Sequence, residues 1–226
     1  MVAAPELSPA FEDYLKAIWT SQEWSDTPIT TNALAGRMGF APSTISEAVK
    51  KLSERGLVTH RKYGSIDLTD QGRAAALQVV RRHRIIETFL VQHLGYGWDQ
   101  VHDEAEILEH AVSDTLIERL SVSLGNPTRD PHGDAIPSMD GRVDRPPAVA
   151  LDTVPVGGVY TVARVADTSP EVLRYLRDAA ILLDVSIAVD RRNDAAGVMS
   201  VTVGEQSVEL GIAAAAAVWV APARNG

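Results

Sequence analysis

The pattern of residues 30–72 constrains the fold of this chain more than any other feature. "TTNALAGRMG" predicts a short helix that ends at Gly39, and "APSTISEAVKKLSERG" predicts a second helix that ends at Gly56, because glycine is favoured just past a helix C-terminus. The following "LVTHRKYGSIDLTDQG" alternates apolar and polar residues on both sides of Gly64, which is typical of a β-hairpin. With the amphipathic stretch at 7–21 as a first helix, these segments predict a winged helix-turn-helix.

The rest of the chain predicts two further kinds of structure. A long helix is expected from about 70 to 93 and a second one roughly over 98–124. After a Pro-, Gly- and Asp-rich stretch, short Val-rich alternating runs and one helix at 170–180 predict a small β-barrel. We therefore expect a mainly α fold with α+β parts, divided into a winged helix-turn-helix (1–75), a helical domain (76–142), a linker (143–152) and a small barrel (153–226).

Composition excludes several classes of function. The chain has no cysteine, so disulfides, thiolate nucleophiles, iron–sulfur clusters and cysteine zinc sites are all excluded. The net charge is −9, but residues 37–84 hold ten Lys or Arg against four acids, a locally basic segment that suits DNA. No apolar run is long enough for a membrane span and the N-terminal stretch does not resemble a signal peptide, so we expect a cytoplasmic protein without a membrane partner.

The helix predicted from "APSTISEAVKKLSERG" has the properties of a DNA recognition helix. Ile45, Val49 and Leu52 are spaced to pack inward, which leaves a polar face at the N-terminal end of the helix, where such helices meet base edges. Side chains that suit bases and phosphates are Ser43, Thr44, Ser46, Glu47, Lys50, Lys51, Arg61 and Lys62. The alternative is a polar face used only for contacts with proteins.

The stretch "VHDEAEILEH" predicts a helix face built of metal ligands. His102, Glu106, Glu109 and His110 lie at i, i+4, i+7 and i+8, which is one face of a helix. A solvated charged face is the alternative for this helix taken alone. The preceding helix carries His83 and Glu87 at i, i+4, and the first helix carries Asp13. If these helices pack together, three segments bring imidazole and carboxylate groups to one place.

These motifs, together with "RRHRIIETFL" and "DPHGDAIP", resemble the diphtheria toxin repressor family of metal-dependent transcriptional regulators, in particular its manganese-responsive branch. The resemblance implies an SH3-like, FeoA-like C-terminal domain over 153–222 and two metal ions per subunit. The implied regulatory site comprises Asp13, Glu106, Glu109 and His110. The implied ancillary site comprises His83, Glu87 and His102. The C-terminal domain is implied to lend a further ligand, with Glu171 nearest to the expected position and Asp167 a weaker candidate.

Residues of this chain that differ from the family pattern indicate which metal ion is bound. Iron-responsive members carry methionine and cysteine where this chain has Asp13 and Glu106, and harder oxygen ligands favour Mn(II). Lys16 replaces a carboxylate that short manganese regulators use, so a close two-metal cluster is not expected. Asp130 and Asp134 stand where iron-responsive members hold an anion, so no anion is expected.

The resemblance implies a Mn(II)-activated homodimeric repressor, not an enzyme, that binds a palindromic double-stranded DNA operator and controls manganese uptake genes. The nearest alternative is an Fe(II)-dependent regulator of the same family. A helical di-metal enzyme is a second alternative, but such sites need a histidine three residues after each of two glutamates, and neither Glu106 nor Glu109 has one. A barrel-bearing adaptor that binds peptides is the third.

Overall fold

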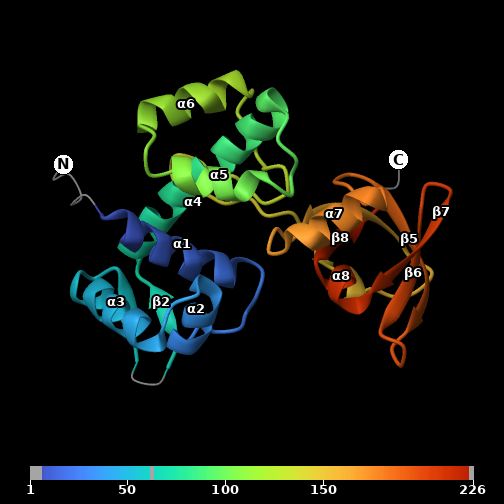
Figure 1. Cartoon of the computed structure of the whole chain (residues 1–226), viewed down its shortest axis with the longest axis horizontal. Coiled ribbons are helices and arrows are strands. Elements are labelled where there is room, and N and C mark those ends of the chain that lie inside the picture. The colour runs from blue at the N-terminus through green and yellow to red at the C-terminus, as the bar shows by residue number, and fades with distance from the viewer. Residues whose placement is uncertain (1–6, 62–63, 224–226) are drawn as a thin grey trace. The chain divides into compact units, whose positions relative to one another are not determined.

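A computed structural model describes residues 7–61 and 64–223 and divides the chain into two compact units (Figure 1). The first unit comprises Met1–His83 and Pro137–Arg142, and the second comprises Arg84–Ile136 and Val143–Gly226. Among the helices in the described ranges, none combines the length and the apolar character that a membrane crossing requires.

The first unit is a winged helix-turn-helix. Gly39 closes the second helix in the left-handed conformation (φ 69°) and Pro42 opens the third, so the turn between them is short. The two wing strands pair antiparallel with Thr59 opposite Asp67. The elements are α1 (Pro9–Glu23), α2 (Thr31–Met38), α3 (Pro42–Glu54), β1 (Val58–His60), β2 (Ile66–Leu68) and the first part of α4 (Asp70–Leu94).

The core of the first unit follows the predicted apolar pattern. Ile45, Val49 and Leu52 of α3 are at most 1% exposed, as their spacing on the recognition helix predicts. Leu15 and Ile18 of α1 are also fully buried. Burial of these side chains fixes which face of α3 remains exposed, because a helix that buries one stripe leaves the opposite stripe in water.

The second unit begins with the rest of α4 and continues with α5 (Val101–Leu108) and α6 (Asp114–Ser123). The prediction of one helix over 98–124 is therefore wrong. The Ser113 side chain accepts a hydrogen bond from the Leu116 backbone N–H, and this N-cap starts a new helix where the sequence pattern had suggested continuity. Glu109 and His110 consequently follow the end of α5 and do not lie within it.

The C-terminal part of the second unit is a β domain. Its six strands form one antiparallel sheet in the order β3-β8-β4-β5-β6-β7, and the sheet packs around a core that includes Leu176 and Ile187. The first strand begins at Val149, inside the stretch expected to be a linker. The elements are β3 (Val149–Ala150), η1 (Leu151–Thr153), β4 (Val159–Val165), α7 (Pro170–Asp178), β5 (Ser186–Asn193), β6 (Val198–Val203), β7 (Gln206–Gly211), α8 (Ile212–Ala216) and β8 (Val218–Pro222).

A loop after α6 lies directly against this β domain. Gly133 has φ +93°, and a Cβ there would lie 2.3 Å from the Ala163 carbonyl oxygen, so only glycine fits. The Val165 N–H donates to the His132 carbonyl at 2.8 Å. The Asp130 carboxylate accepts from the N–H groups of His132 and Asp134 at 2.8 and 2.9 Å. The loop therefore has internal hydrogen bonds that hold its conformation and a backbone hydrogen bond to β4. Together these contacts set the position of His132.

Candidate metal centre and DNA-binding face

The exposed face of α3 carries the residues predicted to contact DNA. Ser43, Thr44 and Ser46 are exposed at the start of the helix, and the Ser46 hydroxyl donates to the Pro42 carbonyl at 2.8 Å. Two ion pairs line the same face, Lys51 with Glu47 at 2.8 Å and Lys50 with Glu54 at 3.9 Å. Arg61 is also exposed. The remaining predicted contact, Lys62, lies outside the described residues.

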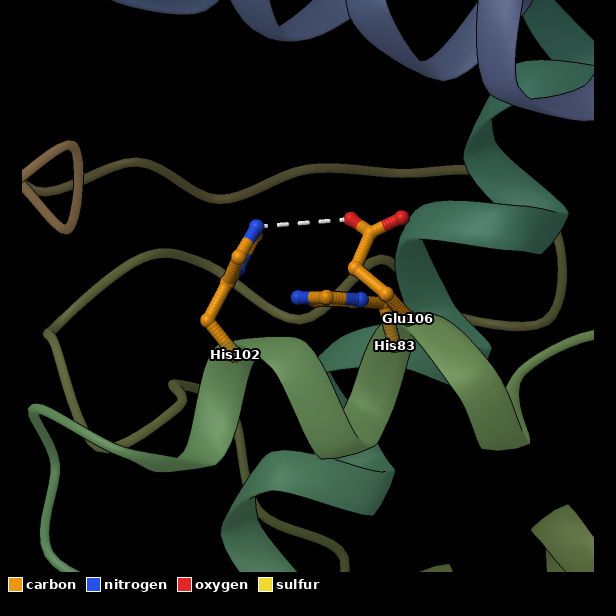
Figure 2. Close-up of side chains that lie close together, drawn as sticks. All are labelled: His83, His102 and Glu106. Carbon is orange, nitrogen blue, oxygen red and sulfur yellow. Dashed lines mark ion pairs between the residues drawn. The ribbon is translucent and has the colours of Figure 1, made fainter.

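A first group of metal-ligating side chains comprises His83, His102 and Glu106, each with a ligand atom within 4.8 Å of the others. Figure 2 shows His102 and Glu106 extending from α5, with their ion pair of 3.4 Å between Nε2 and Oε1, and the ring of His83 beside them. His83 lies on the uninterrupted helix α4, one turn before Glu87. Glu106, which the resemblance assigned to the regulatory site alone, therefore lies next to two ancillary residues.

A second group lies wholly within the second unit and comprises Glu87, His132 and Asp167. Glu87 comes from α4, His132 from the loop after α6 and Asp167 from the segment that follows β4. The Nδ1 atom of His132 lies 3.8 Å from Glu87 Oε2. The Nδ1 atom of His102 lies 3.6 Å from Glu87 Oε1 and 3.8 Å from Asp167 Oδ2. His102 thus lies between the two groups and faces carboxylates on both sides.

The electrostatics of the second group favour a positive charge within it. Burial acts to lower the pKa of His132, but the nearby carboxylates of Glu87, Asp130 and Asp167 raise it above its ordinary value. Burial acts to raise the pKa of Asp167, but the His132 and His102 imidazoles hold it below its ordinary value. The Asp167 carboxylate therefore remains charged and attracts cations to this place.

The donor atoms of the second group fit a hard divalent cation. His132 is fully buried, and its Nε2 lies 2.7 Å from the Trp98 carbonyl oxygen. Its Nδ1 is buried without a hydrogen-bond partner within residues 7–61 and 64–223. Buried polar atoms are almost always satisfied, and an exception often marks an ion that is bound there. Oxygen and imidazole ligands suit Mn(II) and Fe(II) better than a soft metal.

The other predicted ligands divide between the two units. Glu109 is fully buried in the second unit, where its Oε1 lies 3.4 Å from His110 Nε2. Asp13 lies on α1 in the first unit, half-buried. The side chain of Glu171 is 77% exposed and pairs with Ser169 and Arg174. The C-terminal residue beside the imidazoles is therefore Asp167, the weaker of the two candidates from the resemblance.

His132 is not among the ligands predicted from the sequence. Helical spacing gave the positions of His83, Glu87 and His102, but His132 lies in a loop whose residues have no periodic pattern. The signal that was available is a single histidine between Asp130 and Asp134 in "DPHGDAIP". In the structure, these two aspartates shape the loop and do not belong to either group.

Arg84 and Arg164 accompany the two loop aspartates. The Arg84 guanidinium donates to the Ala135 carbonyl at 2.6 Å and lies 3.4 Å from Asp130. Arg164 on β4 donates to Asp134 at 2.6 Å. Burial raises the pKa of Asp130 to about 7, with the neighbouring Asp134 acting in the same direction. The two aspartates, which stand where the resemblance implied an anion in iron-responsive members, therefore lie against these arginines.

Family models match almost the whole chain. The iron dependent repressor N-terminal DNA binding domain matches residues 6–66, the iron dependent repressor metal binding and dimerisation domain matches 69–138, and the FeoA domain matches 149–222. The iron-dependent repressor IdeR of Mycobacterium tuberculosis is 30% identical over 217 residues, which cover 91% of this chain and 94% of that protein. The chain belongs to the iron-dependent, or diphtheria toxin, repressor family.

Solved structures of family members add a finer comparison. A manganese-dependent transcriptional repressor in complex with manganese is 52% identical, with a TM-score of 0.91 over 94% of this chain and 99% of that chain. ScaR with bound Cd²⁺ is 33% identical, with a TM-score of 0.82 over 94% of this chain and 99% of that chain. Membership of a repressor family confirms the predicted class, a transcription regulator and not an enzyme, and the order of DNA-binding, dimerisation and FeoA domains.

Proposed function

We propose that the protein is a Mn(II)-activated homodimeric repressor that binds a palindromic operator and controls genes for manganese uptake. The proposal rests on the group of Glu87, His132 and Asp167. Glu87 and His132 are buried, and the Nδ1 atom of His132 lacks a hydrogen-bond partner among the described residues. Every atom that this group can offer is nitrogen or oxygen, which suits Mn(II). The manganese complex of a 52% identical repressor supports the same choice of metal.

Two ions per subunit are proposed, each with its own residues. The regulatory ion would be held by Asp13, Glu106, Glu109 and His110. The ancillary ion would be held by Glu87, His102, His132 and Asp167, with His83 adjoining. Asp167 replaces Glu171 in this proposal because Asp167 lies 3.8 Å from His102 and the Glu171 side chain extends into solvent.

The proposed regulation follows from charge. Asp13, Glu106 and Glu109 repel one another when they are brought together, and like charges disfavour a compact arrangement. A bound divalent cation supplies the positive charge that removes this repulsion. Asp13 belongs to the first unit and Glu109 to the second. If both hold the same ion, the ion would fix the DNA-binding unit to the dimerisation helices of its own subunit. In the dimer, this would also fix the distance between the two DNA-binding units. Two recognition helices about 34 Å apart would then match successive major grooves.

Exposed apolar side chains support the proposed homodimer. Ile107 on α5 and Val122 on α6 are 70% and 67% exposed, and Leu116 on α6 is 43% exposed. Isolated exposed apolar residues are ordinary, but three on two consecutive helices suggest a surface that a partner covers. The family model that matches residues 69–138 describes this region as a metal binding and dimerisation domain.

The test is a metal-dependent selection of DNA. The protein would select duplexes from a random-sequence library with Mn(II) present, and affinity for the selected duplex would then be measured against Mn(II) and, anaerobically, Fe(II). We expect palindromic duplexes, little binding without metal, and half-maximal binding at a free Mn(II) concentration within the range found in cells. Equal affinity with and without metal would contradict the proposal. Activation by Fe(II) alone would support the second candidate, an iron-dependent repressor, which the 30% identical iron-dependent relatives favour.

A further inference from the structure

We infer that Trp98 is a positioning residue for His132, and that it sets which imidazole nitrogen is available to a metal ion. The inference rests on the proposed function, because it concerns the ancillary group, and it adds a residue outside all of the ligand sets described above. Trp98 lies between α4 and α5, and His132 lies in the loop after α6. Both belong to the second unit.

The backbone of Trp98 determines the tautomer of His132. The Trp98 carbonyl oxygen lies 2.7 Å from His132 Nε2. A carbonyl oxygen can only accept a hydrogen bond, so Nε2 must carry a proton. In the neutral imidazole, Nδ1 then carries the lone pair. Since Nδ1 is the atom that faces Glu87 at 3.8 Å, the hydrogen bond to Trp98 directs the lone pair toward the carboxylates of the group.

The indole ring of Trp98 holds the imidazole plane in place. The two rings are stacked, with centroids 6.2 Å apart and an interplanar angle of 14°. The indole Nε1 atom is buried and has no hydrogen-bond partner in the part of the chain that the structure describes. Burying an unsatisfied N–H costs free energy, so the contribution of Trp98 comes from the shape of the ring. A phenyl ring should therefore replace it at little cost.

Trp98 is itself fixed by the C-terminal domain. Its ring packs against the buried core of that domain. The next residue, Asp99, accepts a hydrogen bond from Arg177 Nη1 on α7 at 2.8 Å, and its second oxygen lies 3.7 Å from Arg174. The side chain of Asp99 is only 2% exposed. The short segment 97–99 therefore fixes His132 and also the domain that contributes Asp167.

Trp98 contacts His132 and would not touch the metal ion itself, and contacts of this kind change metal affinity through the ligand that they hold. A hydrogen bond to the second nitrogen of a ligating histidine fixes its tautomer and ring orientation, and losing such a partner typically weakens metal binding about 10- to 100-fold. We therefore expect removal of the Trp98 ring to weaken Mn(II) binding to the ancillary group by about tenfold or more. Binding to the regulatory residues should be unchanged.

The test compares three variants of the full-length protein. Trp98→Leu keeps an apolar side chain but removes the ring, Trp98→Phe keeps a ring, and Trp219→Leu removes an indole from β8 in the same unit. The first readout is the ¹⁵N spectrum of the His132 imidazole in metal-free protein in alkaline buffer, assigned by its loss in His132→Asn. The second readout is Mn(II) affinity, from the electron paramagnetic resonance of free Mn(II). Thermal unfolding of each variant separates a general loss of stability from a loss of positioning.

The expected result is specific to position 98. Wild type, Trp98→Phe and Trp219→Leu should show the Nε2-protonated tautomer and similar Mn(II) affinity. Trp98→Leu keeps the backbone carbonyl at position 98, but without the stacked ring the imidazole can turn away from that carbonyl. This variant should therefore show mixed tautomers and the tenfold loss. The inference is overturned if Trp98→Leu retains both the tautomer and the affinity, or if Trp219→Leu loses them equally. If His132→Asn leaves Mn(II) affinity unchanged, the proposed ancillary site fails, while the tautomer spectrum still decides whether Trp98 positions His132.

Discussion

Asp167 and Glu171 lie four residues apart, but their surroundings differ completely. Asp167 is 3.8 Å from His102, and neighbouring imidazoles hold its pKa below the ordinary value. Glu171 is 77% exposed and pairs with Arg174. We expect Asp167→Ala to weaken Mn(II) binding at the ancillary group by at least about tenfold, since a direct ligand matters no less than an outer-shell residue. Isothermal titration with Mn(II) measures this, with Glu171→Ala as the matched control that should behave like wild type.

Glu87 should link metal binding to the stability of the fold. It is 1% exposed, beside His102 and His132. At Mn(II) a hundred times above its dissociation constant, one site should raise the free energy of unfolding by about 2.7 kcal/mol. Glu87→Gln keeps the size of the side chain but removes the charge that attracts the cation, so most of the increase from this site should disappear. Urea unfolding with and without Mn(II) tests this, and an increase equal to that of wild type would exclude Glu87 as a ligand.

Helical spacing predicted which residues on helices lie close together, but it gives no such information for residues in loops. His83 and Glu87 follow from i, i+4 spacing, which a helix converts directly into proximity. His132 and Trp98 lie in segments with no repeat, and their positions depend on contacts formed only after the β domain packs. Glu106 is hard to assign to a single site. The resemblance assigned it to the regulatory site, but its Oε1 lies 3.4 Å from Nε2 of His102, a residue of the ancillary site.

The exposed face of α3 is the DNA-binding surface that we propose. Lys50 is 76% exposed, and its pair with Glu54 at 3.9 Å is weak, so its charge is available to a phosphate. We expect Lys50→Ala to lower affinity for all duplexes by a similar factor and to reduce the slope of log affinity against log salt by about one. Fluorescence anisotropy over a salt series measures the slope. Arg191→Ala, which removes an exposed cation from β5, should leave it unchanged.

The break between α5 and α6 is a helix end that the spacing of apolar residues does not predict. The pattern over 98–124 is helical throughout, but Ser113 caps a new helix by accepting from Leu116 N–H. An N-cap of this kind contributes about 1 kcal/mol, which is enough to favour two helices over one. As a result Glu109 and His110 leave the face shared by His102 and Glu106. The one metal-binding face predicted from "VHDEAEILEH" is therefore divided.

At the scale of the whole molecule, ion pairs hold the C-terminal domain to the helices of the second unit. Asp99 is buried and pairs with Arg177 at 2.8 Å. Hydrogen bonds between charged groups contribute about 1.5 to 3 kcal/mol, and the half-exposed arginine reduces this, so we expect Asp99→Ala to lower the free energy of unfolding by about 1 to 2 kcal/mol. Urea unfolding measures the change. Asp178→Ala, on the exposed face of α7, is the control and should leave stability close to that of wild type.

The order of the domains could be predicted from the sequence, since each domain has its own periodicity. The contacts between the loop at 130–136 and the β domain could not, because they depend on the backbone conformation of Gly133 and on hydrogen bonds between residues about thirty positions apart in the chain. These contacts are what bring Asp167 to Glu87 and His132. A site that combines separate segments therefore becomes visible only in three dimensions.

In the proposed mechanism, Mn(II) and operator DNA strengthen one another's binding, and reciprocal linkage provides the test. If Mn(II) raises operator affinity by a given factor, the operator must raise Mn(II) affinity by the same factor. Mn(II) affinity would be measured by equilibrium dialysis with the selected duplex and with a scrambled duplex of equal length. We predict that the selected duplex raises Mn(II) affinity by the factor found in the DNA titration. Equal Mn(II) affinity with both duplexes would contradict the account.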